Sequence, residues 1–233
     1  MPVEDIVKLM DSGTKLVGSI VWPALIAFTL VRFGPALRGF FESLSEISLK
    51  GGGVEATAKR QKVEAAAALA VATAVRPGES VAGDAEAKAA GAPQAAVKVV
   101  TDVVTPQVLR RTNGAVVLWV DDRPDNNIYE RQALEALGIK FLISKSTEDA
   151  IDLVSRHRVD AIISDMGRPP DARAGYTLLD SLRAAGNRTP FIIYAGSNAP
   201  EHKAEARRHG AVGSTNRASE LFEYVVQAVT SGL

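Results

Sequence analysis

Regular alternation of apolar and amphipathic segments begins near residue 113 and continues to the C-terminal end of the chain. Short apolar runs predict strands at 115–120, 140–144, 161–164, 190–194 and 211–214. Apolar residues at helical spacing predict helices at 126–137, 146–154, 175–185, 200–209 and 218–229. This order favours a parallel sheet with helices on both faces, because parallel strands need crossover connections.

Acidic residues stand directly after two of the predicted strands. Asp121 and Asp122 follow the first strand, and Asp165 follows the third. Ligands of such sheets bind at the carboxyl ends of the strands, so these carboxylates converge if the first and third strands are neighbours. Converging carboxylates repel one another without a cation. Oxygen ligands suit Mg²⁺, which would orient a phosphoryl group for attack by one carboxylate.

These features resemble the receiver domain of response regulators. Val120-Asp121-Asp122 is similar to the acidic pair that follows the first strand of that family, and Ile163-Ser164-Asp165-Met166 is similar to its phospho-acceptor motif. Pro169 lies four residues after Asp165, as the proline of the family does. The resemblance covers about residues 115–229. It implies an α/β fold with a five-stranded, parallel, doubly wound sheet of the flavodoxin-like kind.

The resemblance also implies a chemistry and a partner. Asp165 would accept a phosphoryl group, and Mg²⁺ would be the cofactor, held by Asp121, Asp122, Asp165 and the backbone carbonyl of Gly167. The partner would be a histidine kinase or another signalling protein. The role expected for the chain is signal transduction as a response regulator. We do not expect an enzyme, because no nucleophile–base pair for an external substrate is visible.

Two positions depart from the pattern of the family. Ala195 stands where receivers have Thr or Ser, and Ser197 substitutes only if its loop bends back. Arg217 stands where receivers have Lys, and a guanidinium is not an ammonium point charge. These groups normally read out phosphorylation. The sequence therefore leaves open a second function, a pseudo-receiver scaffold that oligomerises or binds a partner without phosphoryl chemistry.

The N-terminal segment has a different pattern. No charged residue lies between Lys15 and Arg32, and this apolar run predicts a transmembrane helix, although it is shorter than the ~20 residues of a typical span. More basic residues follow the run than precede it. The positive-inside rule then predicts a single pass through the inner membrane, with the C-terminal domain in the cytoplasm.

Two alternatives to this anchor remain open. The run could be a buried or interfacial helix of a soluble protein. It could be a secretory signal peptide, but the acidic flank before it and the lack of a small-residue cleavage site speak against that. A membrane effector, triggered through the receiver-like domain, is a further functional alternative.

The middle of the chain is rich in alanine. Gly51-Gly52-Gly53 should break any preceding helix, and Val54–Val75 predicts a helix that is either a self-associating stalk or a floppy tether. Residues 76–93 have few large apolar side chains and predict a flexible linker. The expected domains are a membrane-anchoring helical segment at 1–50, a stalk and linker at 51–112, and a receiver-like domain at 113–233.

Composition narrows the partners. Lys and Arg together number 27, as do Asp and Glu, so the formal net charge is zero and no nucleic-acid partner is indicated. The chain has no cysteine, which excludes disulfides and a thiol nucleophile. Its three histidines lack zinc-ligand spacing. The partners that remain expected are the signalling protein implied by the resemblance to receivers, the membrane suggested by the N-terminal run, and a second copy of the chain in a homo-oligomer.

Overall fold

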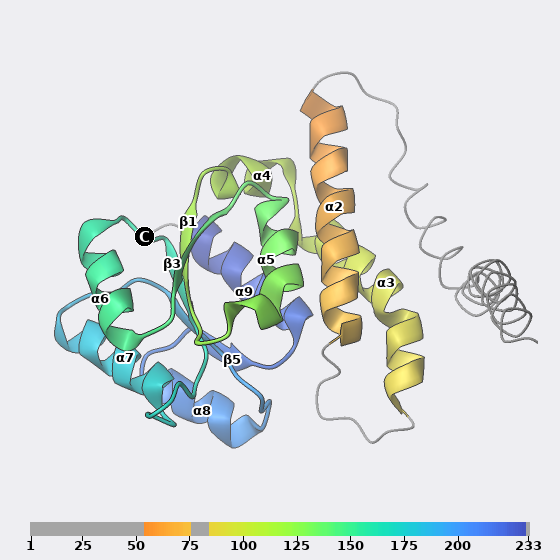
Figure 1. Cartoon of the computed structure of the whole chain (residues 1–233). Helices are drawn as coiled ribbons and strands as arrows, with labels where there is room; N and C mark the ends of the chain where they lie inside the picture. Colours follow the sequence, from red (N-terminus) through yellow and green to blue (C-terminus); the bar gives the residue numbers. More distant parts are fainter. Residues whose placement is uncertain (1–53, 76–83, 232–233) are drawn as a thin grey trace, which may run out of the picture.

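The structure is a computed structural model that describes residues 54–75 and 84–231 (Figure 1). The predicted membrane-anchoring segment at 1–50 lies outside the described residues. Within the described ranges, no helix combines the length and the apolar character that crossing a membrane requires.

Five parallel strands form the sheet, and the predicted fold class is confirmed. The strands are β1 (Val116–Val120), β2 (Lys140–Ser144), β3 (Ala161–Ser164), β4 (Phe191–Tyr194) and β5 (Gly213–Thr215). Their spatial order is β2-β1-β3-β4-β5, and all neighbouring pairs are parallel. The first and third strands are neighbours, with Val120 opposite Ser164. The residues that follow β1 and β3 therefore lie side by side.

Helices cover both faces of the sheet (Figure 1). They are η1 (Pro124–Asn127), α5 (Ile128–Glu135), α6 (Thr147–Arg156), α7 (Ala174–Ala184), α8 (Pro200–Arg208) and α9 (Ala218–Thr230). Because side chains alternate along a strand, Trp119 packs in one cluster with α5 and α9, whereas Leu118 packs in another with α6, α7 and α8. Each predicted helix of this half is present.

Local signals set the ends of two helices. The Ser146 hydroxyl accepts a hydrogen bond from the Asp149 amide at 3.1 Å and caps α6. Gly138 ends the turn after α5 with a φ of 87°. A Cβ there would also lie 2.8 Å from Asn113 Oδ1, so both the backbone angle and the space require glycine.

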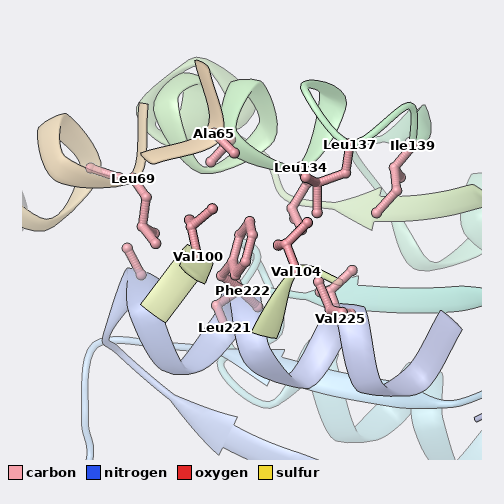
Figure 2. Packing of buried hydrophobic residues seen from close by; sticks show 14 of the residues in the cluster. Ala65, Leu69, Val100, Val104, Leu134, Leu137, Ile139, Leu221, Phe222 and Val225 are labelled. Carbon is pink, nitrogen blue, oxygen red and sulfur yellow. The ribbon is translucent and has the colours of Figure 1, made fainter. Parts of the chain in front are cut away.

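Two further helices, α2 (Val54–Val75) and α3 (Asp84–Val103), pack beside α5 and α9, and α4 (Pro106–Thr112) leads from them into β1 (Figure 1). The predicted helix at Val54–Val75 is confirmed, but it is not a floppy tether. Leu69 is 1% exposed and shares one hydrophobic cluster with Val100 of α3 and Phe222 of α9 (Figure 2). This cluster includes residues on both sides of the predicted domain division at 112 and 113, a division that stays a prediction.

The flexible linker predicted at 76–93 is wrong for residues 84–93, which belong to α3. The helix continues through Pro93. Ala92, Ala96 and Val100 recur at helical spacing and are each 2% exposed or less. The linker prediction relied on the lack of large apolar residues. Small residues nevertheless form a helix readily and let two helices approach closely, so their burial needs only an apolar surface to pack against.

Candidate metal and phospho-acceptor site

Asp121, Asp122 and Asp165 converge at the carboxyl ends of β1 and β3, as the sequence predicts. Each offers a carboxylate oxygen that lies within 4.8 Å of the oxygens of the other two. Asp121 is buried, and the other two are partly exposed. Parallel pairing of β1 with β3 brings residues more than 40 positions apart into one cluster. Three hard oxygen donors at this spacing fit a divalent cation such as Mg²⁺.

Asp121 is held in place by two hydrogen bonds. The backbone amide of Arg123 donates to one carboxylate oxygen at 2.7 Å, and the Asn127 side-chain amide donates to the other at 2.6 Å. Asn127 is 1% exposed and ends the η1 turn. These bonds orient the carboxylate before any ligand arrives. Asn127 was not predicted from the sequence, where it is one of two consecutive asparagines near the start of a helix.

The environment of Asp165 disfavours the ionised form of its carboxyl group. Burial raises the pKa of its carboxyl above the ordinary value, and the charges of Asp121 and Asp122 raise the pKa further. The hydrogen bond that the Met166 amide donates to Asp165 Oδ1, at 2.7 Å, acts in the opposite direction, as does the charge of Arg168. On balance the pKa is raised, so the ionised cluster is stabilised by any bound cation.

Gly167 lies in the loop between β3 and α7 that follows Asp165. Arg168 and Asp171 close this loop with a pair of backbone hydrogen bonds of 2.9 and 2.8 Å. Gly167 is partly buried, and a Cβ at this position would lie 3.4 Å from the backbone oxygen of Ala172. No contact among the described residues tests its carbonyl as a metal ligand, so that role stays a prediction.

Arg168 is a buried cation beside the cluster and was not singled out in the sequence. It is 4% exposed. Its guanidinium donates to the oxygens of four residues, at distances of 2.7 to 3.1 Å: Ser164 Oγ, Asp165 O, Ala174 O and Thr147 Oγ1. The sequence carries no signal for this burial, because an arginine before two prolines in a polar loop is ordinarily exposed.

Comparison with known proteins agrees with this geometry. The family model for the response regulator receiver domain matches residues 117–220. Residues 117–220 form a response regulator receiver domain. Such domains are modules of two-component signalling.

Curated relatives share this domain. The chain is 35% identical over 127 residues to the virulence sensor protein BvgS of Bordetella pertussis, a match of 52% of this chain and 10% of that protein. The BvgS protein of Bordetella bronchiseptica is 35% identical over 113 residues, covering 46% of this chain and 8% of the relative. The chain thus spans about a tenth of the length of these relatives.

Solved structures are similar over about half of the chain. The chemotaxis response regulator CheY4 of Vibrio cholerae is 25% identical, with a TM-score of 0.43, over 50% of this chain and 99% of that one. The receiver domain of the sensor histidine kinase PA1611 from Pseudomonas aeruginosa, with a magnesium ion coordinated in its active-site cleft, is 26% identical, with a TM-score of 0.42, over 51% and 99%.

The predicted switch positions, Ala195 or Ser197 and Arg217, do not carry the residues that the resemblance to receivers implies. Ala195 follows β4 and offers no hydroxyl group. Ser197 is engaged elsewhere, since its hydroxyl lies 2.8 Å from His202 Nδ1 and accepts a hydrogen bond from the Ala199 amide at 3.3 Å. Ala195 and Ser197 line a hollow of about 350 Å³ together with Met166.

Arg217, at the lysine position, also interacts away from the acidic cluster. Its side chain is 60% exposed, and Nη1 lies 3.3 Å from Glu220 Oε1, one turn along α9. Glu220 in turn accepts a hydrogen bond from the Thr215 hydroxyl at 2.9 Å. The three predicted metal-binding carboxylates are therefore brought together, whereas Ser197 and Arg217 are held by other partners.

Proposed function

We propose that this chain is an atypical response regulator in which Asp165 accepts a phosphoryl group in a Mg²⁺-dependent reaction. The observation that carries the proposal is the convergence of three carboxylates within 4.8 Å at the ends of adjacent strands. Asp121, Asp122, Asp165 and the carbonyl of Gly167 would hold the ion. When bound, Mg²⁺ would neutralise the charge that develops on the phosphoryl oxygens and orient them.

The residues of the chain divide the remaining tasks. Asp165 Oδ1 accepts the Met166 amide, and Oδ2 receives no hydrogen bond within the described part of the chain. Oδ2 is therefore the oxygen that attacks phosphorus. A P–O bond forms there as the P–N bond of a phosphohistidine donor breaks, and the donor imidazole leaves. Asp121, whose carboxylate is held by hydrogen bonds from Arg123 and Asn127, would present its oxygens to the ion in a fixed orientation.

The output is proposed to pass through the helices that precede the receiver domain. Helices α2 and α3 pack against α5 and α9. A shift of α5 or α9 on phosphorylation would therefore also move α2 and α3. The uncharged run between Lys15 and Arg32 supports attachment to the inner membrane, with the receiver domain in the cytoplasm. The partners would be a histidine kinase or another signalling protein, the membrane and a second copy of the chain. No nucleic acid and no enzymatic reaction on an external substrate belong to this proposal.

The proposal is tested by labelling the full chain with acetyl phosphate or beryllofluoride, with and without Mg²⁺. Wild type should be modified only with the metal, and Asp165→Asn should abolish the modification. Asp171→Asn is the matched control, since Asp171 lies in the same loop but outside the acidic cluster. If the wild-type chain shows no Mg²⁺-dependent modification, the proposed phosphorylation is rejected.

A pseudo-receiver scaffold is the second candidate function. It is favoured by Ala195 at one switch position and by the pairing of Arg217 with Glu220 at the other. A scaffold of this kind would bind its partner or itself through α2, α3 and the receiver surface. Its oligomeric state, measured by light scattering, should then be the same with and without beryllofluoride, whereas a working switch should change it.

A further inference from the structure

Arg168 carries a positive charge in an almost fully buried position, directly behind the acidic cluster. Its backbone lies three residues after Asp165, and Nη1 donates to the Asp165 carbonyl at 2.8 Å and to the Ser164 hydroxyl at 2.7 Å. Nη2 donates to Ala174 O at 3.0 Å and to Thr147 Oγ1 at 3.1 Å. The guanidinium thus connects the end of β3 with the first turns of α6 and α7.

These partners are neutral oxygens rather than carboxylates. Arg168 Nε is also buried and has no hydrogen-bond partner among the described residues. A buried guanidinium without a directly bonded carboxylate is costly, and arginine does not lose its proton at physiological pH. Hydrogen bonding alone therefore leaves the charge poorly compensated. The negative charges that act on the guanidinium through space are those of the acidic cluster and Asp171.

The electrostatic effect is mutual. Burial lowers the pKa of Arg168, and the charges of Asp165, Asp121 and Asp171 raise that pKa. In return, the Arg168 charge lowers the pKa of Asp165 against the larger effect of burial. The cluster and Arg168 therefore act as counter-ions to each other when no metal is bound.

We propose that Arg168 is an internal counter-cation that partly neutralises the Asp121–Asp122–Asp165 cluster and thereby weakens its affinity for divalent cations. Two positive charges on a bound ion and one on Arg168 would then share the same three carboxylates. Arg168 is a positioning residue, since it contacts the backbone of Asp165 and not the reacting atoms. The inference rests on the proposed function to the extent that the cluster binds Mg²⁺.

Calorimetric titration of the full chain with Mg²⁺ tests this inference. Arg168→Gln removes the charge and keeps a hydrogen-bond donor, whereas Arg168→Lys keeps the charge and reduces the number of donors. We expect the Mg²⁺ dissociation constant of Arg168→Gln to fall by roughly three- to tenfold, since the Arg168 charge interacts with the same carboxylates and would repel a bound cation. The dissociation constant of Arg168→Lys should stay within about twofold of wild type on the same grounds.

A charge-matched control separates this effect from a general change in net charge. Arg173→Gln removes one positive charge from the same loop, but Arg173 is largely exposed and paired with Glu205 at 2.6 Å. Its effect on Mg²⁺ affinity should be clearly smaller than that of Arg168→Gln. Circular dichroism of each variant establishes that it is folded. If Arg168→Gln does not fold, Arg168→Met, which fills the buried space without charge, takes its place.

The outcomes separate this inference from the proposed function. Unchanged or weaker Mg²⁺ binding in the folded, uncharged variant overturns the role of Arg168 while leaving the metal site intact. An equal gain in Arg173→Gln overturns it as well. If neither wild type nor any variant binds Mg²⁺, the proposed phosphorylation chemistry falls together with the inference.

Discussion

One face of the sheet is covered by a single layer of helices, whereas the other is covered by two. Helices α6, α7 and α8 lie on the first face, and no further helix of the described residues covers them (Figure 1). Helices α5 and α9 lie on the second face and are themselves covered by α2 and α3. The surface of this receiver domain is therefore not uniformly open to partners, because α2 and α3 of the same chain already cover α5 and α9.

The doubly covered face also reaches the functional edge of the sheet. Tyr194, the last residue of β4, packs edge-on against Trp119 with ring centroids 6.0 Å apart. Its hydroxyl donates to the buried Glu130 of α5 at 2.8 Å. Ala195, at the switch position, follows directly. The end of β4 thus contacts α5, and α5 in turn packs against α2. A rearrangement at the end of β4 would therefore disturb both helices.

The largest effect is expected where the two layers meet. Phe222→Ala should lower the free energy of unfolding by about 3–5 kcal/mol, because Phe222 is 1% exposed and belongs to the cluster that contains residues of both layers (Figure 2). Leu178→Ala, in the singly covered face, is the control and should cost about 2–5 kcal/mol. Denaturant unfolding measures both changes. Only Phe222→Ala should also speed hydrogen exchange in α2. Equal exchange in the two variants would contradict coupling between the layers.

A smaller effect is expected in the outer layer itself. Leu69→Ala should lower the free energy of unfolding by about 2–3 kcal/mol, near the low end for buried leucines, since an outer helix can shift inward to fill the cavity. Val71→Ala, on the exposed side of α2, should change it by less than about 0.5 kcal/mol. Limited proteolysis between residues 54 and 75 is a second readout. Resistance in Leu69→Ala equal to that of wild type would show that α2 is held by other contacts.

Removing the polar contact between β4 and α5, within the doubly covered face, should have a moderate effect. Tyr194→Phe keeps the ring against Trp119 and removes the hydroxyl that donates to Glu130, so it should cost about 1–2 kcal/mol. Tyr129→Phe is the matched control, because Tyr129 is 38% exposed, and it should cost about 0.5 kcal/mol or less. Thermal unfolding compares the two. If both substitutions have the same small effect, the Tyr194–Glu130 bond contributes little.

The smallest expected effect is a pH dependence at the acidic edge. Because the pKa of Asp165 is raised in the folded chain, the folded state binds its proton more tightly than the unfolded state does. Stability without metal should therefore fall as pH rises from the unfolded value of about 3.8 through the raised folded value, and stay lower above it.

Asp165→Asn should remove this loss and be more stable than metal-free wild type at neutral pH. The gain should be less than about 1 kcal/mol, because Asp165 is partly exposed to solvent and screened. Unfolding curves measured from pH 3 to pH 8 in a metal chelator test the sign. A wild-type chain that gains stability over this range relative to Asp165→Asn would reverse the assigned shift.

Much of the receiver domain could be predicted because its signals are local. The continuous apolar run before Asp121 indicates a strand buried on both faces, and Ser146 with Asp149 marks the start of a helix by residue type alone. Strand ends can be read from such runs, and the parallel arrangement then places Asp121 and Asp165 together. The acidic cluster was therefore predictable without knowledge of any contact.

Only the tertiary structure decided those features that depend on which part of the same chain lies opposite a residue. Small residues such as Ala66 and Ala96 are compatible with a tether or a packed helix, and only the apolar surface of α5 and α9 selects the second. Arg168 is likewise compatible with solvent or with burial, and only the loop that closes over it fixes its guanidinium behind Asp165. Periodicity determines which residues form strands and helices, whereas the burial of small or charged side chains depends on what lies opposite them in space.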